Sequence, residues 1–198
     1  MRYQKGHKDA TRRHIIDVAA RRFRSDGVAA AGLAGVMADA GLTNGAFYTH
    51  FESKDDLVRE TLLASLEQMR KRTLGAGEGE AGLGTGIRDY LSARHRDHPE
   101  TGCPTSALIA EIARQPKKTR MAYGARLASY LDLVAGRMSG GSTEERHRRA
   151  TALHALLIGT LQLARAVNDR AQSDRILADG IAAALDLAGI ANEASVSA

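Results

Sequence analysis

Residues 33–57 read LAGVMADAGLTNGAFYTHFESKDDL, and this stretch decides the fold. Apolar residues recur at the spacing of an amphipathic helix, at Leu33, Val36, Met37 and Ala40. Gly41 can adopt the left-handed conformation that ends such a helix. Thr43 can then cap a short helix over Asn44–His50. Two short helices joined by a tight glycine turn predict a helix-turn-helix.

The side chains of the second short helix suit contact with a DNA duplex. Asn44 can pair with a base edge and Thr49 can touch a thymine methyl group. Tyr48 and His50 can donate hydrogen bonds to phosphate. Lys54 follows at the start of the next helix, which Ser53 caps, and adds a second kind of phosphate ligand.

The same run resembles the signature of the tetracycline-repressor (TetR) family of transcriptional regulators, and the resemblance extends back to Phe23 and Gly27. It implies operator-reading roles for Thr43, Asn44, Gly45 and Thr49, phosphate-contacting roles for Tyr48, His50 and Lys54, and core positions for Phe47 and Phe51. The sequence departs from the family pattern at three positions. Ala31 stands where a capping Thr is usual, Gly32 where Ser is common, and Met37 where a small Ala is usual.

The N-terminal end is basic. Residues 1–24 hold eight basic and two acidic side chains, a net +6 in a chain of +5 overall, which indicates a polyanionic partner at this end. A helix with a buried stripe (Ile16, Ala19, Ala20, Phe23) is expected to end at Gly27. We expect Met1–Lys8 to form a mobile arm before it. A solvated helix face is the alternative interpretation of the charge.

The rest of the chain is expected to be helical throughout. Glycine is frequent over 75–86, so this stretch is expected to be a flexible connection; its GxGxxG pattern lacks the preceding strand that a dinucleotide site needs. Helices are expected over about Ser53–Arg72, Ile87–His98, Pro104–Gln115, Lys117–Met138, from Ser142 or Thr143 to Asp169, and from a Ser173 cap to Ala188.

These patterns predict an all-α protein of about nine helices. The N-terminal three-helix helix-turn-helix head is expected at residues 1–54, a larger ligand-binding and dimerisation domain at 55–190, and a disordered tail at 191–198. Apolar residues cover more than one face of Leu153–Val167 and Ile176–Ile190. The family resemblance implies that the last two helices form a homodimer, with Leu185 in the interface; a monomer with a thick core is the alternative.

The resemblance also implies an effector pocket after the fourth helix, for an unidentified small molecule. Its candidate lining residues are Tyr90, His95, Cys103, Tyr123, Leu127, Tyr130 and Leu157. Cys103 precedes Pro104 at a helix start, so a thiol that senses oxidants or electrophiles is one alternative and a small buried residue is another. His95, His98 and Cys103 have no spacing typical of a metal site, and no metal or cofactor is expected.

Other function classes lack sequence support. No nucleophile elbow, phosphate-binding loop or metalloprotease motif is present, so the chain is not expected to be an enzyme, although an all-helical enzyme is an alternative. The single cysteine permits no internal disulfide, and the longest late charge-free run is too short to span a membrane. We expect a cytoplasmic regulator that binds double-stranded operator DNA as a homodimer and makes no membrane contact.

Overall fold

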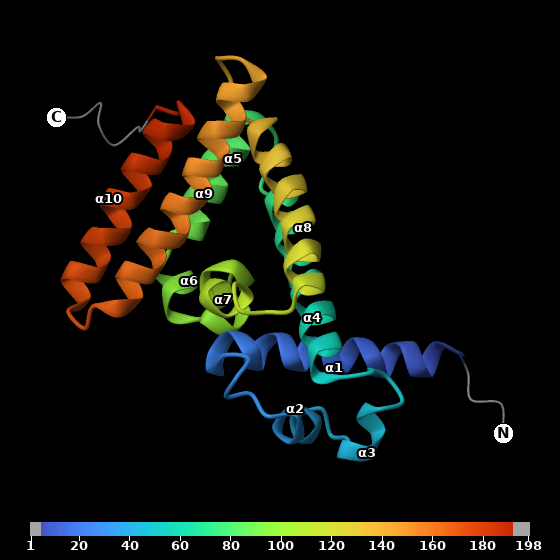
Figure 1. The fold of residues 1–198 in the computed structure, drawn as a ribbon. Coiled ribbons are helices and arrows are strands. Elements are labelled where there is room, and N and C mark those ends of the chain that lie inside the picture. Colours follow the sequence, from blue (N-terminus) through green and yellow to red (C-terminus); the bar gives the residue numbers. More distant parts are fainter. Residues whose placement is uncertain (1–4, 192–198) are drawn as a thin grey trace. The chain divides into compact units, whose positions relative to one another are not determined.

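The computed structural model describes residues 5–191, which contain α-helices, one short 3-10 helix and no strand (Figure 1). In chain order the elements are α1 (Lys5–Asp26), α2 (Leu33–Asp39), α3 (Asn44–Phe47), α4 (Lys54–Gly75), α5 (Gly79–Tyr90), α6 (Ala93–Asp97), η1 (Pro99–Thr101), α7 (Pro104–Ile112), α8 (Lys117–Ala135), α9 (Thr143–Ala166) and α10 (Arg170–Ala188). The prediction of an all-α fold is confirmed. None of the described helices combines the length and the apolar composition that crossing a bilayer requires.

The chain divides into two compact units. One comprises Met1–Gln68 and Pro99–Gly124, and the other comprises Met69–His98 and Ala125–Ala198. We call them the head unit and the distal unit. The head unit thus includes η1 and α7, which are remote in sequence from α1, α2 and α3. The functional boundary predicted between residues 54 and 55 stays a prediction, because packing units and functional domains need not coincide.

The head unit is organised around α1. The predicted stripe of Ile16, Ala19, Ala20 and Phe23 is buried, and Gly27 ends the helix at a φ of +84°. A hydrogen bond of 3.1 Å from the Ala29 amide to the Glu111 carboxylate then joins the turn after α1 to α7. These two residues are far apart in sequence, so only the tertiary structure brings them together.

The first helix begins earlier than predicted. Helix α1 already begins at Lys5, because no proline or glycine run interrupts the chain before the apolar stripe, so Lys8 is an exposed helical residue and not part of a mobile arm. Arg2 lies outside the described residues, as does the tail predicted at 191–198 except for Ala191.

In the distal unit α9 and α10 lie side by side as an antiparallel pair (Figure 1). A capping box begins α9: the Ser142 hydroxyl accepts from the Glu145 amide, and the Glu145 carboxylate accepts from the Ser142 amide. The cap predicted for the last helix was wrong. Asp169 caps α10 by accepting from the Gln172 amide at 3.0 Å, whereas Ser173 is buried one turn inside the helix.

The glycine-rich stretch is the largest correction to the predicted elements. It was expected to be a flexible connection, but Gly79–Tyr90 forms α5, and a break near Leu91 separates α5 from α6. Glycine weakens a helix by about 1 kcal/mol relative to alanine. Burial of Leu83 and Ile87, and close packing of Gly84 against Leu185 of α10 and Ile190 after it, compensate for that cost.

Candidate nucleic-acid interface and effector region

The turn between α2 and α3 has the conformation that the sequence predicts. Gly41 has a φ of +69°, and its amide donates to the Ala38 carbonyl at 2.9 Å. The Leu42 amide donates to the Met37 carbonyl at 2.9 Å. The two bonds together form the C-terminal cap of α2, which depends on glycine at position 41. A side chain at position 41 would be strained, because L residues rarely adopt this conformation.

Five of the seven predicted DNA-contacting residues form one exposed row on α3 and its flanks: Thr43, Asn44, Gly45, Tyr48 and Thr49. The Tyr48 side chain is 72% exposed. Thr43 occupies the N-cap position, but its side chain makes no capping hydrogen bond, contrary to prediction. Helix α3 is also shorter than predicted, and the chain continues as a turn through His50.

Beneath this row, Phe47 and Phe51 are buried and stack with a ring separation of 5.4 Å. The Arg12 guanidinium of α1 lies 4.8 Å from the centre of the Phe51 ring, a cation–π distance. Arg12 also donates to the His50 carbonyl at 3.4 Å. The aromatic pair therefore fixes the turn that presents Tyr48, and the core role predicted for both phenylalanines agrees with their burial.

His50 and Lys54 differ from the exposed row because both are half-buried. Nδ1 of His50 is buried and has no hydrogen-bond partner among the described residues. Partial burial, together with the positive charges of Lys8 and Arg12, lowers the pKa of His50, so the ring is neutral near pH 7. Lys54 is the first residue of α4, where the Ser53 hydroxyl accepts from the Asp56 amide at 3.1 Å, as predicted.

Helix α2 lacks a side-chain cap, as the departures from the family pattern suggest. The capping position is Gly32, not Ala31, and it offers no side-chain acceptor. Ala31 is completely buried instead. The open backbone of Gly32, at a φ of −62°, has nothing within 4 Å of a built Cβ, so a capping serine would fit there.

The residues predicted to line an effector pocket are divided between the two units. Cys103 and Tyr123 belong to the head unit, and the other five belong to the distal unit: Tyr90, His95, Leu127, Tyr130 and Leu157. Within the head unit the Tyr123 hydroxyl donates to the Thr105 hydroxyl at 3.4 Å. Cys103 is 4% exposed at the N-cap of α7, which fits a small buried residue better than a reactive thiol.

Two ring pairs stand out in the distal unit. Tyr90 and His95 meet edge to face at 4.7 Å, and His95 Nδ1 lies 2.7 Å from the Tyr90 carbonyl. Burial lowers the pKa of His95 to about 4, so the neutral ring donates from Nδ1. Among the described residues, no group of three His, Cys, Asp or Glu side chains is placed to hold a metal ion.

The other pair includes a residue that sequence reasoning missed. His154 of α9 is 6% exposed, its ring lies 5.1 Å from that of Tyr130, and neither of its ring nitrogens has a hydrogen-bond partner in the described part of the chain. Burial lowers its pKa to about 4. Its position between the apolar residues Leu153 and Leu157 is the one signal in the sequence that could have revealed a buried polar group on this helix.

An ionic network connects α6 to the α9–α10 pair. Arg96 is 5% exposed and donates to the Ser173 hydroxyl at 2.8 Å and to the Asp174 carboxylate at 2.6 Å. Arg165 donates to the His95 and Arg96 carbonyls. These contacts hold the short α6 helix, and with it His95, against α9 and α10.

The dimer interface residue chosen from the sequence proves to be in the core. Leu185 is completely buried within the distal unit and lies near Gly84 of α5. The exposed face of α9 has a different composition. It presents small residues around one large apolar side chain at helical spacing: Ala152, Ala155, Gly159, Leu163 and Ala166. Leu163 is 62% exposed.

Residues 15–61 match the family described as bacterial regulatory proteins, tetR family. The HTH-type transcriptional regulator AcrR of Shigella flexneri is 44% identical over 59 residues, which are 30% of this chain and 27% of that protein. The HTH-type transcriptional regulator TtgR of Pseudomonas putida is 40% identical over 80 residues, which are 40% of this chain and 38% of that protein. The matches thus span well under half of these curated relatives.

Solved structures extend the likeness in fold to most of the chain. The reduced form of Escherichia coli NemR is 19% identical with a TM-score of 0.74, over 89% of this chain and 96% of that one. A TetR-family regulator from Cytophaga hutchinsonii is 20% identical with a TM-score of 0.74, over 94% of this chain and 97% of that one. The relatives are regulators, so the enzyme alternative is not supported. Residues 15–61 thus match the tetR family of bacterial regulatory proteins, and the all-helical fold of the chain is similar to that of solved TetR-family regulators.

Proposed function

We propose that the chain is a transcriptional repressor that binds operator DNA as a homodimer and is released by a small-molecule effector. The observation that supports DNA binding best is the exposed row from Thr43 to Thr49 over the buried Phe47–Phe51 pair. Exposed polar side chains on a rigid support are what base and phosphate contacts require, because a mobile support would add an entropic cost to each contact.

Within that row, each side chain has a proposed task. Asn44 and Gly45, at the start of α3, approach base edges, and Thr43 and Thr49 flank them. Tyr48 donates its hydroxyl to a phosphate, and Lys54 supplies the ionic contact. His50 is neutral, so its contribution to phosphate binding is a hydrogen bond without charge.

The exposed face of α9 supports the homodimer. Small residues at helical spacing let two backbones approach closely, and Leu163 provides apolar area that is exposed in one chain. A twofold dimer would present two heads to an inverted repeat, with half-sites separated by about one DNA turn, roughly 34–36 Å. Leu163→Glu, not Leu185→Glu, is the substitution that tests this interface without damaging the core.

The buried ring pairs of the distal unit support an effector site. An imidazole with two unpartnered nitrogens is costly in a folded protein, and a ligand with a donor or acceptor would satisfy it. We therefore add His154 to Tyr130 and Leu157 as the proposed effector-binding residues of α8 and α9.

The decisive experiment is selection of bound sequences from a random duplex library, followed by affinity measurements at several salt concentrations. We expect an inverted repeat. Lys54→Ala should lower the slope of log affinity against log salt by about 0.9, and Tyr48→Ala should weaken binding with little change in slope because it is uncharged. Lys117→Ala, at the exposed start of α8, is the matched control.

Asn44→Ala should relax preference at one base pair, at a cost of about 1–3 kcal/mol if the contact is bidentate. Leu163→Glu should produce monomers in sedimentation and weaken operator binding. Wild-type affinity in both Tyr48→Ala and Lys54→Ala would refute DNA binding through α3, and wild-type dimers of Leu163→Glu would refute the α9 interface.

A further inference from the structure

Two basic residues of α1 face the turn that follows α3. Arg12 Nε donates to the His50 carbonyl at 3.4 Å, and Lys8 precedes Arg12 by one helical turn, so both side chains leave the same face of α1. The positive charges of both residues lower the pKa of the His50 ring, which places both of them beside it. Neither residue is among those to which the helix-turn-helix motif assigns a DNA contact.

The guanidinium of Arg12 is engaged within the protein on three sides. It lies 4.8 Å from the centre of the Phe51 ring, and its Nη1 and Nη2 groups each lie 3.5 Å from a carboxylate oxygen of Glu60 on α4. The third contact is the His50 carbonyl. Glu60 balances the charge and the ring covers one face, so a move of Arg12 toward a phosphate would break all three contacts.

These contacts fix the turn that carries Tyr48. The His50 and Phe51 amides donate to the Phe47 carbonyl at 2.9 and 3.0 Å, which ties the turn to α3. Arg12 holds the same turn from the other side, at the His50 carbonyl. A turn that is fixed at both ends loses less conformational freedom when Tyr48 meets DNA, so the fixed turn favours tighter binding.

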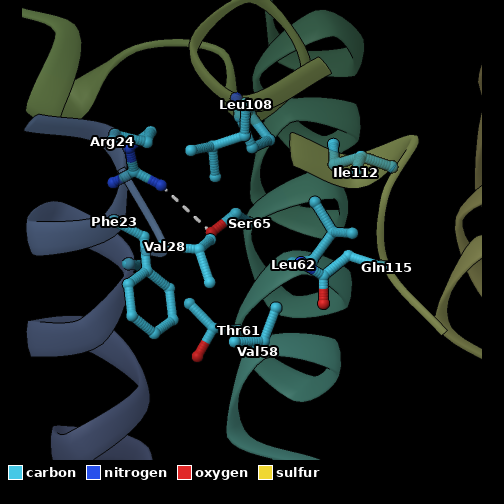
Figure 2. A pocket seen from close by; sticks show the side chains of 12 residues that line it. Phe23, Arg24, Val28, Val58, Thr61, Leu62, Ser65, Leu108, Ile112 and Gln115 are labelled. Carbon is cyan, nitrogen blue, oxygen red and sulfur yellow. Dashed lines mark hydrogen bonds between the residues drawn. The ribbon is translucent and has the colours of Figure 1, made fainter. Parts of the chain in front are cut away.

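Helix α1 is itself anchored to the rest of the head unit. Farther along the helix, Phe23 and Arg24 line a pocket together with Val58, Thr61 and Ser65 of α4 (Figure 2). Arg24 Nη1 donates to the Ser65 hydroxyl at 3.0 Å. The N-terminal turns of α1 therefore extend from a fixed core, which holds the two basic residues beside the α3 turn.

The surroundings of Lys8 differ from those of Arg12. The Lys8 side chain is exposed, and within residues 5–191 it forms no ion pair. It therefore has an unbalanced positive charge next to His50, whose neutral ring can offer a phosphate only a hydrogen bond without charge. An ammonium group at this place suits the phosphate that His50 is proposed to contact.

From this contrast we propose that α1 extends the DNA-binding surface through two residues with different roles. Lys8 is a phosphate ligand beside His50, whereas Arg12 is a positioning residue that holds the α3 turn and does not touch DNA. The inference rests on the proposed binding of operator DNA. It predicts that the loss of these two positive charges, only one helical turn apart, has different consequences for binding.

The test compares Lys8→Ala and Arg12→Met in the full-length chain, with a duplex that the wild type binds. Lys8→Ala should lower the slope of log affinity against log salt by about 0.9, so its loss of affinity should be about three- to fourfold larger at about 50 mM salt than at about 200 mM. Arg12→Met should weaken binding about tenfold at every salt concentration and leave the slope unchanged. Arg12→Lys keeps a cation at the Phe51 ring and should recover part of this loss.

Two variants are matched controls. Lys117→Ala removes the same charge at the exposed start of α8, and Arg21→Met removes it from the opposite, exposed face of α1. Both should bind like the wild type. Without DNA, NMR titration of His50 tests the placement itself: its pKa should rise in Lys8→Ala and in Arg12→Met, because each substitution removes a charge that lowers it.

An unchanged slope in Lys8→Ala, a lowered slope in Arg12→Met, or an unchanged His50 pKa in Lys8→Ala would overturn the inference while binding through α3 stands. If Arg12→Met fails to fold, Arg12→Lys decides the role of Arg12, since full wild-type affinity in that variant would show that charge alone matters. A wild type that binds no duplex would instead refute the proposed function, and the inference with it.

Discussion

The α3 surface and the ring pairs of the distal unit are opposite kinds of candidate site. The α3 residues are exposed, adjacent in sequence and supported from below by Phe47 and Phe51. The distal pairs are wholly or partly buried, and Tyr130 and His154 come from different helices. A surface for a large polyanion needs only local order, whereas a site that encloses a small molecule needs several helices to converge. The first kind can therefore be predicted from a short motif and the second cannot.

The sharpest test of this contrast compares two neighbouring aromatic residues. Phe47 is completely buried and Tyr48 is 72% exposed. Phe47→Ala should lower the free energy of unfolding by about 3–5 kcal/mol, because it leaves a cavity beneath the turn. Tyr48→Ala should cost about 1 kcal/mol, the value of its edge-to-face contact with Phe47, while it abolishes much of the DNA affinity. Urea unfolding and gel-shift titration measure the two effects. Similar stability losses in both variants would contradict this division of roles.

Two histidines of α9 sharpen the comparison within the distal unit. Burial lowers the pKa of His154 to about 4, below the unfolded value of about 6.5. The contribution of the neutral His154 ring to the free energy of unfolding is therefore fully present above pH 6.5. It decreases as the pH falls toward 4, because the unfolded chain takes up the proton first. The loss between pH 7 and pH 4.5 should be about 2 kcal/mol. His154→Leu should remove this share of the pH dependence in urea unfolding.

His147 is the matched contrast, because a hydrogen bond to Asp132 raises its pKa. The protonated His147 ring therefore stabilises the folded chain below pH 6.5, and this stabilisation is lost as the pH rises through the raised pKa. His147→Gln should therefore change the pH profile in the direction opposite to His154→Leu. Parallel profiles for the two variants would show that burial does not control His154.

The smallest expected effect concerns the uncapped start of α2. Gly32→Ser should provide the missing cap and stabilise the head by about 0.5 kcal/mol, since a serine at this position satisfies a helix amide and also reduces the freedom of the unfolded chain. Gly32→Ala reduces that freedom without providing a cap, so it should be less stable than the serine variant. An alanine variant as stable as the serine variant would argue against capping.

Most predictions that involve only neighbouring residues agree with the structure, although the predicted Thr43 cap makes no hydrogen bond. Gly41 and the Ser53 cap involve only neighbours along the chain, and the structure has them as predicted. Ser142, one of the two caps predicted for α9, is the one that the structure uses. The Ser173 cap failed although the correct residue, Asp169, was only four positions away. Ser173 is committed instead to the Ala164 carbonyl and to Arg96 of α6, contacts that helix propensity does not reveal.

The sequence by itself determined the all-helical class, the helix-turn-helix and the row of residues proposed to meet DNA, because helical periodicity and glycine conformation act over a few residues. Only the tertiary structure decided that Gly79–Tyr90 is a helix, that Leu185 belongs to the core while Leu163 is exposed, and that Thr61, Ser65 and Arg24 border one pocket. In each of these cases a segment distant in sequence decides the outcome. Burial against that segment outweighs the low helix propensity of glycine, or it determines which face of a helix is buried. An intrinsic cost of about 1 kcal/mol per glycine is smaller than the gain from burying a leucine or isoleucine side chain.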